Sequence, residues 1–248
     1  MNHPLSACGS GQGKAAARRP RAGALALAFA ATLAVAQPAG AQVPPSAEQA
    51  ARYDGLLAAA QRGDLAALDR LLAAGADLRT RDAQGRTAVH VAAFARRHEV
   101  LRRLARAGAD LGALENDRYD AVTIAAVADD EDTLRLLLSL GASARLVTSR
   151  YDGTALIAAA HLGHDGVVRQ LIAAGAPLDH VNNLHWTAVI EAVVLGDGGK
   201  RHQATLRALL DAGASTTLAD RNGRTPLELA RARGYAEMVA LLEAADRR

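Results

Sequence analysis

Three stretches of the sequence combine residue types that could bind a metal ion or an anion. In the first, His161-Leu162-Gly163-His164 is followed by Asp165. Two histidines and a carboxylate are donors that zinc accepts. A glycine turn between the two rings spoils their common helical face, however, so we expect no metal there.

The second stretch is the acidic run Asp129-Asp130-Glu131-Asp132. A calcium loop alternates its oxygen ligands and contains a glycine, a geometry that four consecutive acids lack. We expect the run to precede a helix, because carboxylates favour the positive end of the helix dipole. We also expect it to compensate the arginine-rich segment 96–106, for which a patch that binds an acidic partner is the alternative.

The third stretch, Asp197-Gly198-Gly199-Lys200-Arg201, could hold an anion on free backbone amides beside two cations. It lacks the G-x-x-x-x-G-K-S/T spacing of a phosphate loop, and no strand is expected before it. We therefore favour a flexible loop that only lengthens a turn. The chain has one cysteine, Cys8, and no credible pairing of a nucleophile with a base. The sequence thus predicts no catalytic residues, no cofactor and no metal site.

The elements that carry these stretches repeat along the chain. Each unit reads as two short apolar helices, most regularly in Thr154–Ala176, and closes with a glycine that precedes alanine. A period near 33 residues with two helices per unit is typical of a stacked repeat array. The closing glycines are spaced by 33, 33, 34 and 38 residues: Gly75, Gly108, Gly141, Gly175 and Gly213.

Two segments carry a family resemblance. Thr87-Ala88-Val89-His90 and Thr225-Pro226-Leu227 resemble the T-P-L-H-x-A motif that starts the first helix of an ankyrin repeat. The resemblance covers Asp54 to about Ala245. It implies an all-α solenoid of about six helix-turn-helix units with short hairpin-like finger loops. The expected units are approximately 51–81, 82–114, 115–148, 149–181, 182–219 and 220–248.

The same resemblance assigns roles to individual residues. Structural helix-start roles are expected for Thr87, His90, Thr154, Thr187, Thr225 and Pro226. Finger loops and inner helices are expected to form a concave surface that binds another protein. The candidate partner-binding residues lie in or beside the fingers: Arg81, Arg86, Tyr119, Tyr151, Trp186, Arg221 and Arg224. Exposed Tyr and Trp are favoured interface anchors, but for Trp186 sideways packing on the adjacent finger is equally open.

The first 41 residues resemble a secretory signal peptide. Arg18–Arg21 is basic, Ala22–Ala36 is apolar, and Ala39-Gly40-Ala41 is a cleavage signal. The apolar segment is short for a membrane span, although an uncleaved anchor is the alternative. Residues 42–50 are expected to be a linker, in which Ser46 and Gln49 resemble a capping box. The repeat domain should then occupy 51–248.

The charge of the expected mature chain is close to balanced. The first 41 residues hold four of the 29 basic residues and no acid, which leaves 25 basic and 26 acidic residues. General binding of nucleic acid is therefore not expected. The family resemblance implies a non-enzymatic, monomeric protein-binding module. The leader and the alanine and arginine bias place this module in a bacterial periplasm. The alternatives are a secreted effector that acts on a host protein and an enzyme with an unrecognised site.

Overall fold

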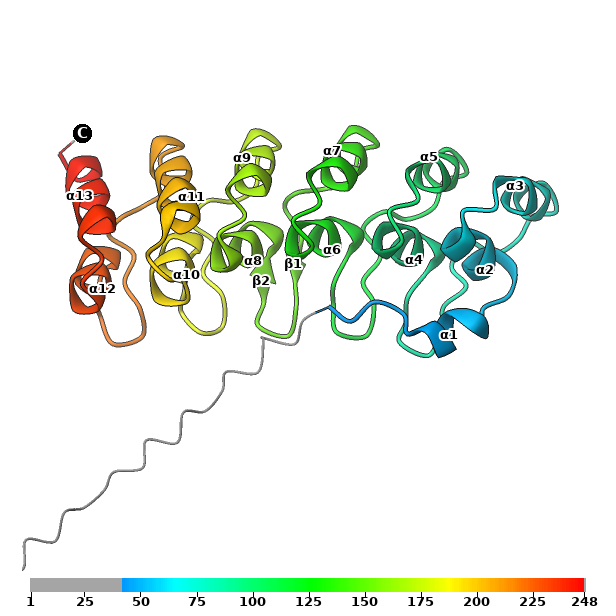
Figure 1. The fold of residues 1–248 in the computed structure, drawn as a ribbon, viewed down its shortest axis with the longest axis horizontal. Helices are drawn as coiled ribbons and strands as arrows, with labels where there is room; N and C mark the ends of the chain where they lie inside the picture. Colours follow the sequence, from blue (N-terminus) through cyan, green and yellow to red (C-terminus); the bar gives the residue numbers. More distant parts are fainter. Residues whose placement is uncertain (1–41, 248) are drawn as a thin grey trace, which may run out of the picture. The chain divides into compact units, whose positions relative to one another are not determined.

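A computed structural model describes residues 42–247 of the chain (Figure 1). The expected signal peptide, its cleavage signal Ala39–Ala41 and Cys8 lie outside the described residues, as does Arg248. The regular secondary structure of the described part is helical except for one pair of two-residue strands. In chain order its elements are α1 (Ala47–Ala51), α2 (Gly55–Arg62), α3 (Leu65–Ala73), α4 (Ala88–Phe94), α5 (His98–Arg106), α6 (Ala121–Val127), α7 (Glu131–Ser139), β1 (Val147–Thr148), β2 (Gly153–Thr154), α8 (Ala155–Leu162), α9 (Asp165–Ala173), α10 (Ala188–Val194), α11 (Lys200–Asp211), α12 (Pro226–Arg233) and α13 (Ala236–Ala245).

Twelve of the described helices form six consecutive pairs, from α2 with α3 to α12 with α13. The first helices of the pairs contact one another in sequence order, and the second helices do the same. Figure 1 shows these as two rows of helices, with the connecting loops along one edge. The predicted stack of six helix-turn-helix units is therefore confirmed, and each unit buries its apolar faces against its neighbours.

The first helices begin at the predicted capping positions. The side-chain oxygens of Thr154 and Thr187 accept the backbone N–H three residues on, which satisfies one free donor of the helix terminus. Thr225 forms a capping box with Glu228, and Pro226 stands at the first helical position. At the start of α4 the backbone N–H of Thr87 donates instead to the His90 ring, at 3.1 Å.

Most turns from first to second helix need a left-handed residue. Gly63 and Gly163 adopt φ of 72° and 69° without strain. At the same position Arg96 has φ 52° and Asp129 has φ 53°. Arg96 and Asp129 thus keep the turn by adopting the left-handed conformation. Such a residue costs roughly 1–2 kcal/mol because its Cβ crowds the following carbonyl oxygen.

The insertion 197–201 is tied to other units, so the expectation of a flexible loop that only lengthens the turn is wrong. Lys200 and Arg201 belong to α11, the longest of the described helices. The Arg201 guanidinium lies 2.8 Å from the carboxylate of Asp129 and 3.7 Å from that of Asp165. The extra residues thus let one side chain of the fifth unit pair with acids of the third and fourth.

The expected linker, 42–50, contains the start of helix α1. Ser46 and Gln49 form the expected capping box, with hydrogen bonds of 2.9 and 3.1 Å, at the start of α1. Helix α1 contacts α2. Pro44 and Pro45 hold the preceding residues extended, since proline lacks a backbone donor and fixes φ. This segment therefore covers the start of the stack.

The stack should be sensitive to loss of a single buried leucine. Leu171 lies on α9 with 0% of its surface exposed. Leu171→Ala should lower the free energy of unfolding by roughly 2–5 kcal/mol through lost burial and a cavity. Urea denaturation followed by circular dichroism measures this. Leu162→Ala, at a position 40% exposed on the same unit, is the control and should change stability little. A denaturation midpoint for Leu171→Ala equal to that of the wild type would contradict the assigned packing.

Candidate functional site

Five finger loops open the second to the sixth unit. We name them finger 2 (82–86), finger 3 (115–119), finger 4 (149–153), finger 5 (182–186) and finger 6 (220–224). In fingers 2, 3, 5 and 6 the first residue donates its backbone N–H to the carbonyl of the fifth, at 2.9–3.0 Å. Finger 4 is closed by β1 and β2, which pair Thr148 with Gly153. The expected hairpin-like fingers are thus present.

One side-chain oxygen organises each finger, and sequence reasoning missed it. The first residue of every finger accepts two backbone N–H groups, those of the third and fifth finger residues, through this oxygen. The sequence signal for this feature was a polar side chain that recurs once in each of the last five repeats, six residues before the first helix begins. These acceptors are Asp82, Glu115, Ser149, Asn182 and Asp220.

Neighbouring fingers are joined into a continuous row. Each finger donates a hydrogen bond to a backbone carbonyl of the finger before it, and three of these bonds come from the backbone. Fingers 2 to 5 are consequently joined by main-chain contacts that do not depend on side-chain identity, whereas finger 6 is joined to finger 5 through the side chain of Arg221. The bonds run from Asn116 N to Gln84 O (3.0 Å), from Ser149 N to Arg118 O (2.9 Å), from Asn183 N to Tyr151 O (2.9 Å) and from Arg221 Nη2 to Asn183 O (3.0 Å).

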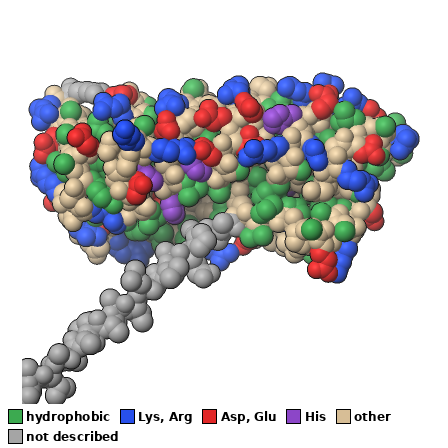
Figure 2. All heavy atoms as spheres, in the orientation of Figure 1, with side chains coloured by type: hydrophobic (Ala, Val, Ile, Leu, Met, Phe, Trp, Pro, Cys, Tyr) green, Lys and Arg blue, Asp and Glu red, His purple; other side chains and the backbone are tan. Residues whose placement is uncertain are grey.

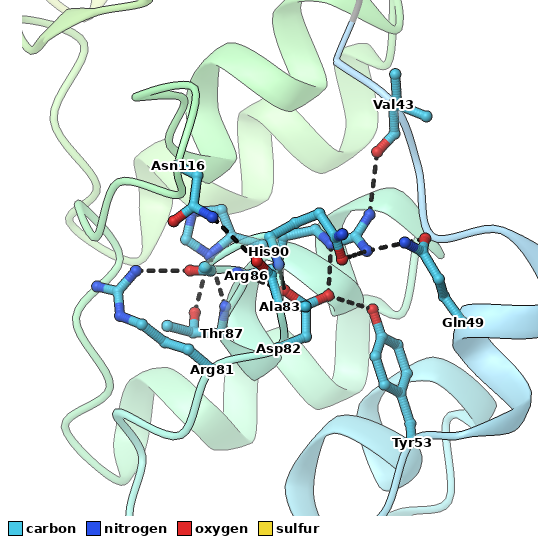
Figure 3. Close-up of polar contacts among 12 residues, drawn as sticks. Val43, Gln49, Tyr53, Arg81, Asp82, Ala83, Arg86, Thr87, His90 and Asn116 are labelled. Atoms are coloured by element: carbon cyan, nitrogen blue, oxygen red, sulfur yellow. Dashed lines mark hydrogen bonds and ion pairs between the residues drawn. The ribbon is translucent and has the colours of Figure 1, made fainter.

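Arg86 lies buried at the base of finger 2 (Figure 3), with 2% of its surface exposed. Its Nε donates to Asp82 Oδ2 at 2.7 Å, and Nη1 and Nη2 donate to Val43 O and Gln49 Oε1, each at 3.1 Å. Arg86 was expected to face a partner. The structure does not place it there, because the segment 43–49 covers it and accepts from Nη1 and Nη2. Nη2 also donates to Gln84 Oε1 at 2.9 Å.

Tyr53 completes this cluster from the first unit. Its hydroxyl donates to Asp82 Oδ2 at 2.6 Å. Burial raises the pKa of Tyr53, and the hydrogen bond to the carboxylate raises it further. Burial alone would raise the pKa of Asp82, but hydrogen bonds from Tyr53 and Arg86 bring it below its usual value. The cluster therefore holds a carboxylate between two donors.

The other candidate arginines are exposed and hold neighbouring groups. Arg81 donates through Nη1 to Gly85 O at 2.6 Å and to Leu114 O at 2.7 Å, so it links finger 2 to the residue that precedes finger 3. Arg221 makes the bond to finger 5 described above. Arg224 pairs with Asp220 at 2.8 Å while 52% of its side chain stays exposed. Arg81, Arg221 and Arg224 thus remain available to a partner on their exposed sides.

The three candidate aromatic residues occupy successive fingers and are half-buried. Tyr119 ends finger 3, Tyr151 lies in finger 4, and Trp186 ends finger 5 and packs against the apolar core. Burial raises the pKa of Tyr119. The carbonyl of Tyr119 accepts a hydrogen bond from His90 Nε2 at 3.1 Å. Burial lowers the pKa of His90 to about 4, so this histidine is neutral near pH 7 and ties finger 3 to helix α4.

Glu191 on α10 is a second feature that sequence reasoning missed. It is 4% exposed, and its Oε1 accepts a hydrogen bond from Asn182 Nδ2 at 3.0 Å. Its Oε2 lies 3.5 Å from His161 Nδ1 and accepts no hydrogen bond from the described residues. Burial raises the pKa of Glu191 to about 7, and burial also lowers the pKa of His161. The signal was an acid four residues after Thr187, in a register that is otherwise apolar: Val91, Ile124, Ala158 and Leu229.

The stretches first considered for metal binding have other partners. His164 donates through Nδ1 to Ala126 O at 2.9 Å. Asp130 caps α7 and lies 3.1 Å from Arg96, so acid and base compensate each other across the second and third units. Among residues 42–247, no group of three or more His, Cys, Asp or Glu side chains could hold a metal ion.

The surface of the described residues carries both signs of charge. Figure 2 shows basic and acidic side chains interspersed over the face drawn, with apolar side chains between them. The larger exposed apolar residues include Leu162 and Leu195 at the ends of first helices and Val181 and Leu184 on or beside finger 5. In this part of the chain no helix has the length and apolar character needed to cross a membrane.

Known proteins share this architecture. Residues 56–148 and 156–246 match a family model described as ankyrin repeats in three copies. YahD of Escherichia coli (strain K12), which is named as an ankyrin repeat protein, is 38% identical over 190 residues, covering 76% of this chain and 94% of YahD. An ankyrin repeat domain from Acinetobacter baumannii has a TM-score of 0.73 and 42% identity, covering 77% of this chain and 97% of that chain. A chain in the complex of a predatory endopeptidase from Bdellovibrio bacteriovorus with an immunity protein has a TM-score of 0.64. With 22% identity over 77% of this chain and 98% of that one, it is alike in fold alone.

The buried carboxyl of Glu191 makes stability depend on pH. Its pKa of about 7 in the folded chain exceeds the ordinary 4.5, so its stabilising contribution is full below about pH 4.5 and is lost as pH rises to 7. Glu191→Gln keeps an acceptor for Asn182 and removes this loss. Above pH 7 the variant should exceed the wild type by up to roughly 3 kcal/mol in free energy of unfolding, and near pH 4 the two should agree.

Urea denaturation from pH 4 to 8 measures the difference between Glu191→Gln and the wild type. Titrating groups that do not contact Glu191 largely cancel in this difference. Glu237→Gln, on the exposed side of α13, is the control and should follow the wild type at every pH. A Glu191→Gln difference that stays constant across the interval would contradict the raised pKa.

Proposed function

The chain belongs to the ankyrin repeat family, and on that premise we propose that it is a non-enzymatic protein-binding module exported to the bacterial periplasm. Binding proteins is what domains of this family generally do, without catalysis. The observation that carries the proposal is the row of fingers. Main-chain hydrogen bonds join fingers 2 to 5, and the Arg221 side chain joins finger 6 to finger 5. The row presents exposed arginines and half-buried aromatic residues on successive units.

A rigid row suits protein recognition for a physical reason. Binding costs free energy when loops must become ordered, and a surface that is already fixed avoids part of this cost. Trp and Arg are also the residue types most often found where binding energy concentrates. The Bdellovibrio structure is described as an endopeptidase in complex with an immunity protein. The likeness in fold to a chain of this complex supports the proposal that the partner is another protein. It does not identify that partner.

Export rests on the first 41 residues. A basic start, the apolar segment Ala22–Ala36 and the signal Ala39–Ala41 follow the order of a secretory leader. We expect the mature chain to begin at Gln42. The mature chain would then contain no cysteine, so its folding would need no disulfide in an oxidising compartment.

Fractionation of a bacterium that expresses the full chain tests export. The protein should appear in the periplasmic fraction, and its N-terminal sequence should start at Gln42. A soluble cytosolic protein whose sequence begins near Met1 would contradict export, and release into the medium would favour the secreted effector.

Affinity capture tests protein binding. The chain, used as bait on an envelope extract, should retain a partner that mass spectrometry identifies. If Trp186 is an anchor, Trp186→Ala should weaken binding of that partner by about 2 kcal/mol, or about 30-fold. Thermal unfolding should change much less. A lowered melting temperature with unchanged affinity would instead make Trp186 a packing residue of finger 5.

Tyr119→Ala is the companion variant. If both aromatic residues contact one partner, the double variant should lose less affinity than the two single losses predict. Folded single variants that bind the partner as tightly as the wild type would remove the finger aromatics from the binding surface.

A further inference from the structure

The same six-residue motif occurs at two fingers of the stack. Finger 2 with the next residue reads Asp82-Ala83-Gln84-Gly85-Arg86-Thr87, and finger 6 reads Asp220-Arg221-Asn222-Gly223-Arg224-Thr225. In both, the aspartate closes the turn and its Oδ2 accepts a hydrogen bond from Nε of the arginine four residues on, at 2.7 Å in finger 2 and 3.1 Å in finger 6. The two motifs therefore share the turn and the bond from Nε to Oδ2. They differ at Nη2, which in Arg224 also donates to Asp220 Oδ2, at 2.8 Å, and in Arg86 donates to Gln49 and Gln84.

The copies differ in what covers the arginine. The side chain of Arg86 is 3% exposed and that of Arg224 is 52% exposed. The covering group at Arg86 is the chain's own segment 43–49, whose contacts are drawn in Figure 3. No described residue accepts a hydrogen bond from Nη1 of Arg224, the atom that in Arg86 donates to the carbonyl of Val43. Finger 6 thus presents an open copy of an occupied contact.

The segment on Arg86 shows what chemistry the contact selects. Arg86 donates a hydrogen bond to the backbone carbonyl of Val43, and 74% of the surface of Val43 stays exposed. The contact therefore does not depend on the valine side chain. Pro44 and Pro45 restrict the segment to an extended conformation and remove two backbone donors. An extended, proline-containing segment with a free carbonyl is therefore the ligand type at finger 2.

We propose that the finger 6 motif, Asp220 with Arg224, binds an extended proline-containing segment of a partner protein through a backbone carbonyl. This inference rests on the proposed protein-binding function and names the chemistry of its partner. A neutral carbonyl fits better than a carboxylate, because Asp220 already compensates the guanidinium and would repel a second anion.

Finger 5 supplies apolar surface beside this motif. Arg221 donates to the carbonyl of Asn183, which fixes fingers 5 and 6 next to each other. Val181 is 44% and Leu184 is 36% exposed there. Trp186 directly precedes Thr187, the N-cap of α10, just as Tyr53 directly precedes Asp54, the N-cap of α2. Proline rings and aliphatic side chains of an extended segment pack well against aromatic surfaces of this kind.

The chain's own segment provides the probe. A labelled peptide with the sequence of residues 42–50, blocked at both ends, is titrated with the full chain and followed by fluorescence anisotropy. The tethered segment stays on Arg86 because its effective concentration is far higher, so binding of the added peptide reports on Arg224. Trp186, the only tryptophan, provides a second readout.

Arg224→Ala should weaken peptide binding at least tenfold, the loss expected from removing a charge-assisted hydrogen bond. Arg224→Lys should also weaken it, because an ammonium group cannot donate to Asp220 and the carbonyl in the same geometry. Arg233→Ala removes an exposed arginine of α12 outside the fingers and should bind as the wild type does. A probe with alanine in place of both prolines should bind more weakly. Circular dichroism establishes that the variants are folded.

Three results would overturn the assignment. One is a peptide that does not bind the wild type, and another is binding that Arg224→Ala leaves unchanged. The third is self-association of the chain that Arg224→Ala abolishes, which would give the site to a second copy. If the partner captured from the envelope extract binds Arg224→Ala as tightly as the wild type, the proposed protein-binding function is supported and the finger 6 site is contradicted.

Discussion

A single side-chain oxygen at the start of each finger sets the geometry on which the rest of the binding edge depends. It accepts two backbone N–H groups within the next four residues, which folds the chain back just before the first helix begins. Aspartate, glutamate, serine and asparagine all serve, because the turn requires an oxygen at that distance and not a charge. Each finger therefore enters its first helix with the same backbone geometry. The main-chain hydrogen bonds between fingers follow from that regularity.

The opposite edge of the stack is joined by a comparable series that uses side chains. In four units a residue after the inter-helix turn donates to a carbonyl at or just after the end of the preceding unit's first helix. With both edges bonded, a unit cannot shift without breaking contacts to both neighbours, which is the nearest-neighbour coupling of a solenoid. The series runs from Arg97 Nε to Gln61 O (3.2 Å), from His164 Nδ1 to Ala126 O (2.9 Å), from His202 Nε2 to His161 O (2.9 Å) and from Tyr235 Oη to Gly196 O (3.0 Å). His202 keeps this role despite the insertion before it, since the insertion extends α11 toward its N-terminus.

The spacing of glycines and capping residues predicted the helix pairs well, because both report local backbone conformation. The burial of Arg86 could not be predicted in this way. Its motif matches that of Arg224, and only the packing of residues 43–49 separates a buried arginine from an exposed one. Pro44-Pro45 indicates an extended segment and says nothing about the surface on which it lies. The insertion 197–201 was underestimated for the same reason, since the partner of Arg201, Asp129, stands 72 positions earlier in the chain.

Glu191 shows how one substitution in a finger propagates into the helix below. At finger 5 the acceptor is Asn182, whose amide oxygen must face the N–H groups of Leu184 and Trp186. Its NH2 group is thereby turned toward the buried side, where an unpaired donor would be costly. The acids of fingers 2, 3 and 6 have no such hydrogens. The amide of finger 5 thus requires an acceptor that the carboxylates do not require, and Glu191 provides it in a register that is otherwise apolar. The Asn182 amide consequently contacts both features: its NH2 group donates to the Glu191 carboxyl, and its oxygen accepts the backbone N–H groups of finger 5.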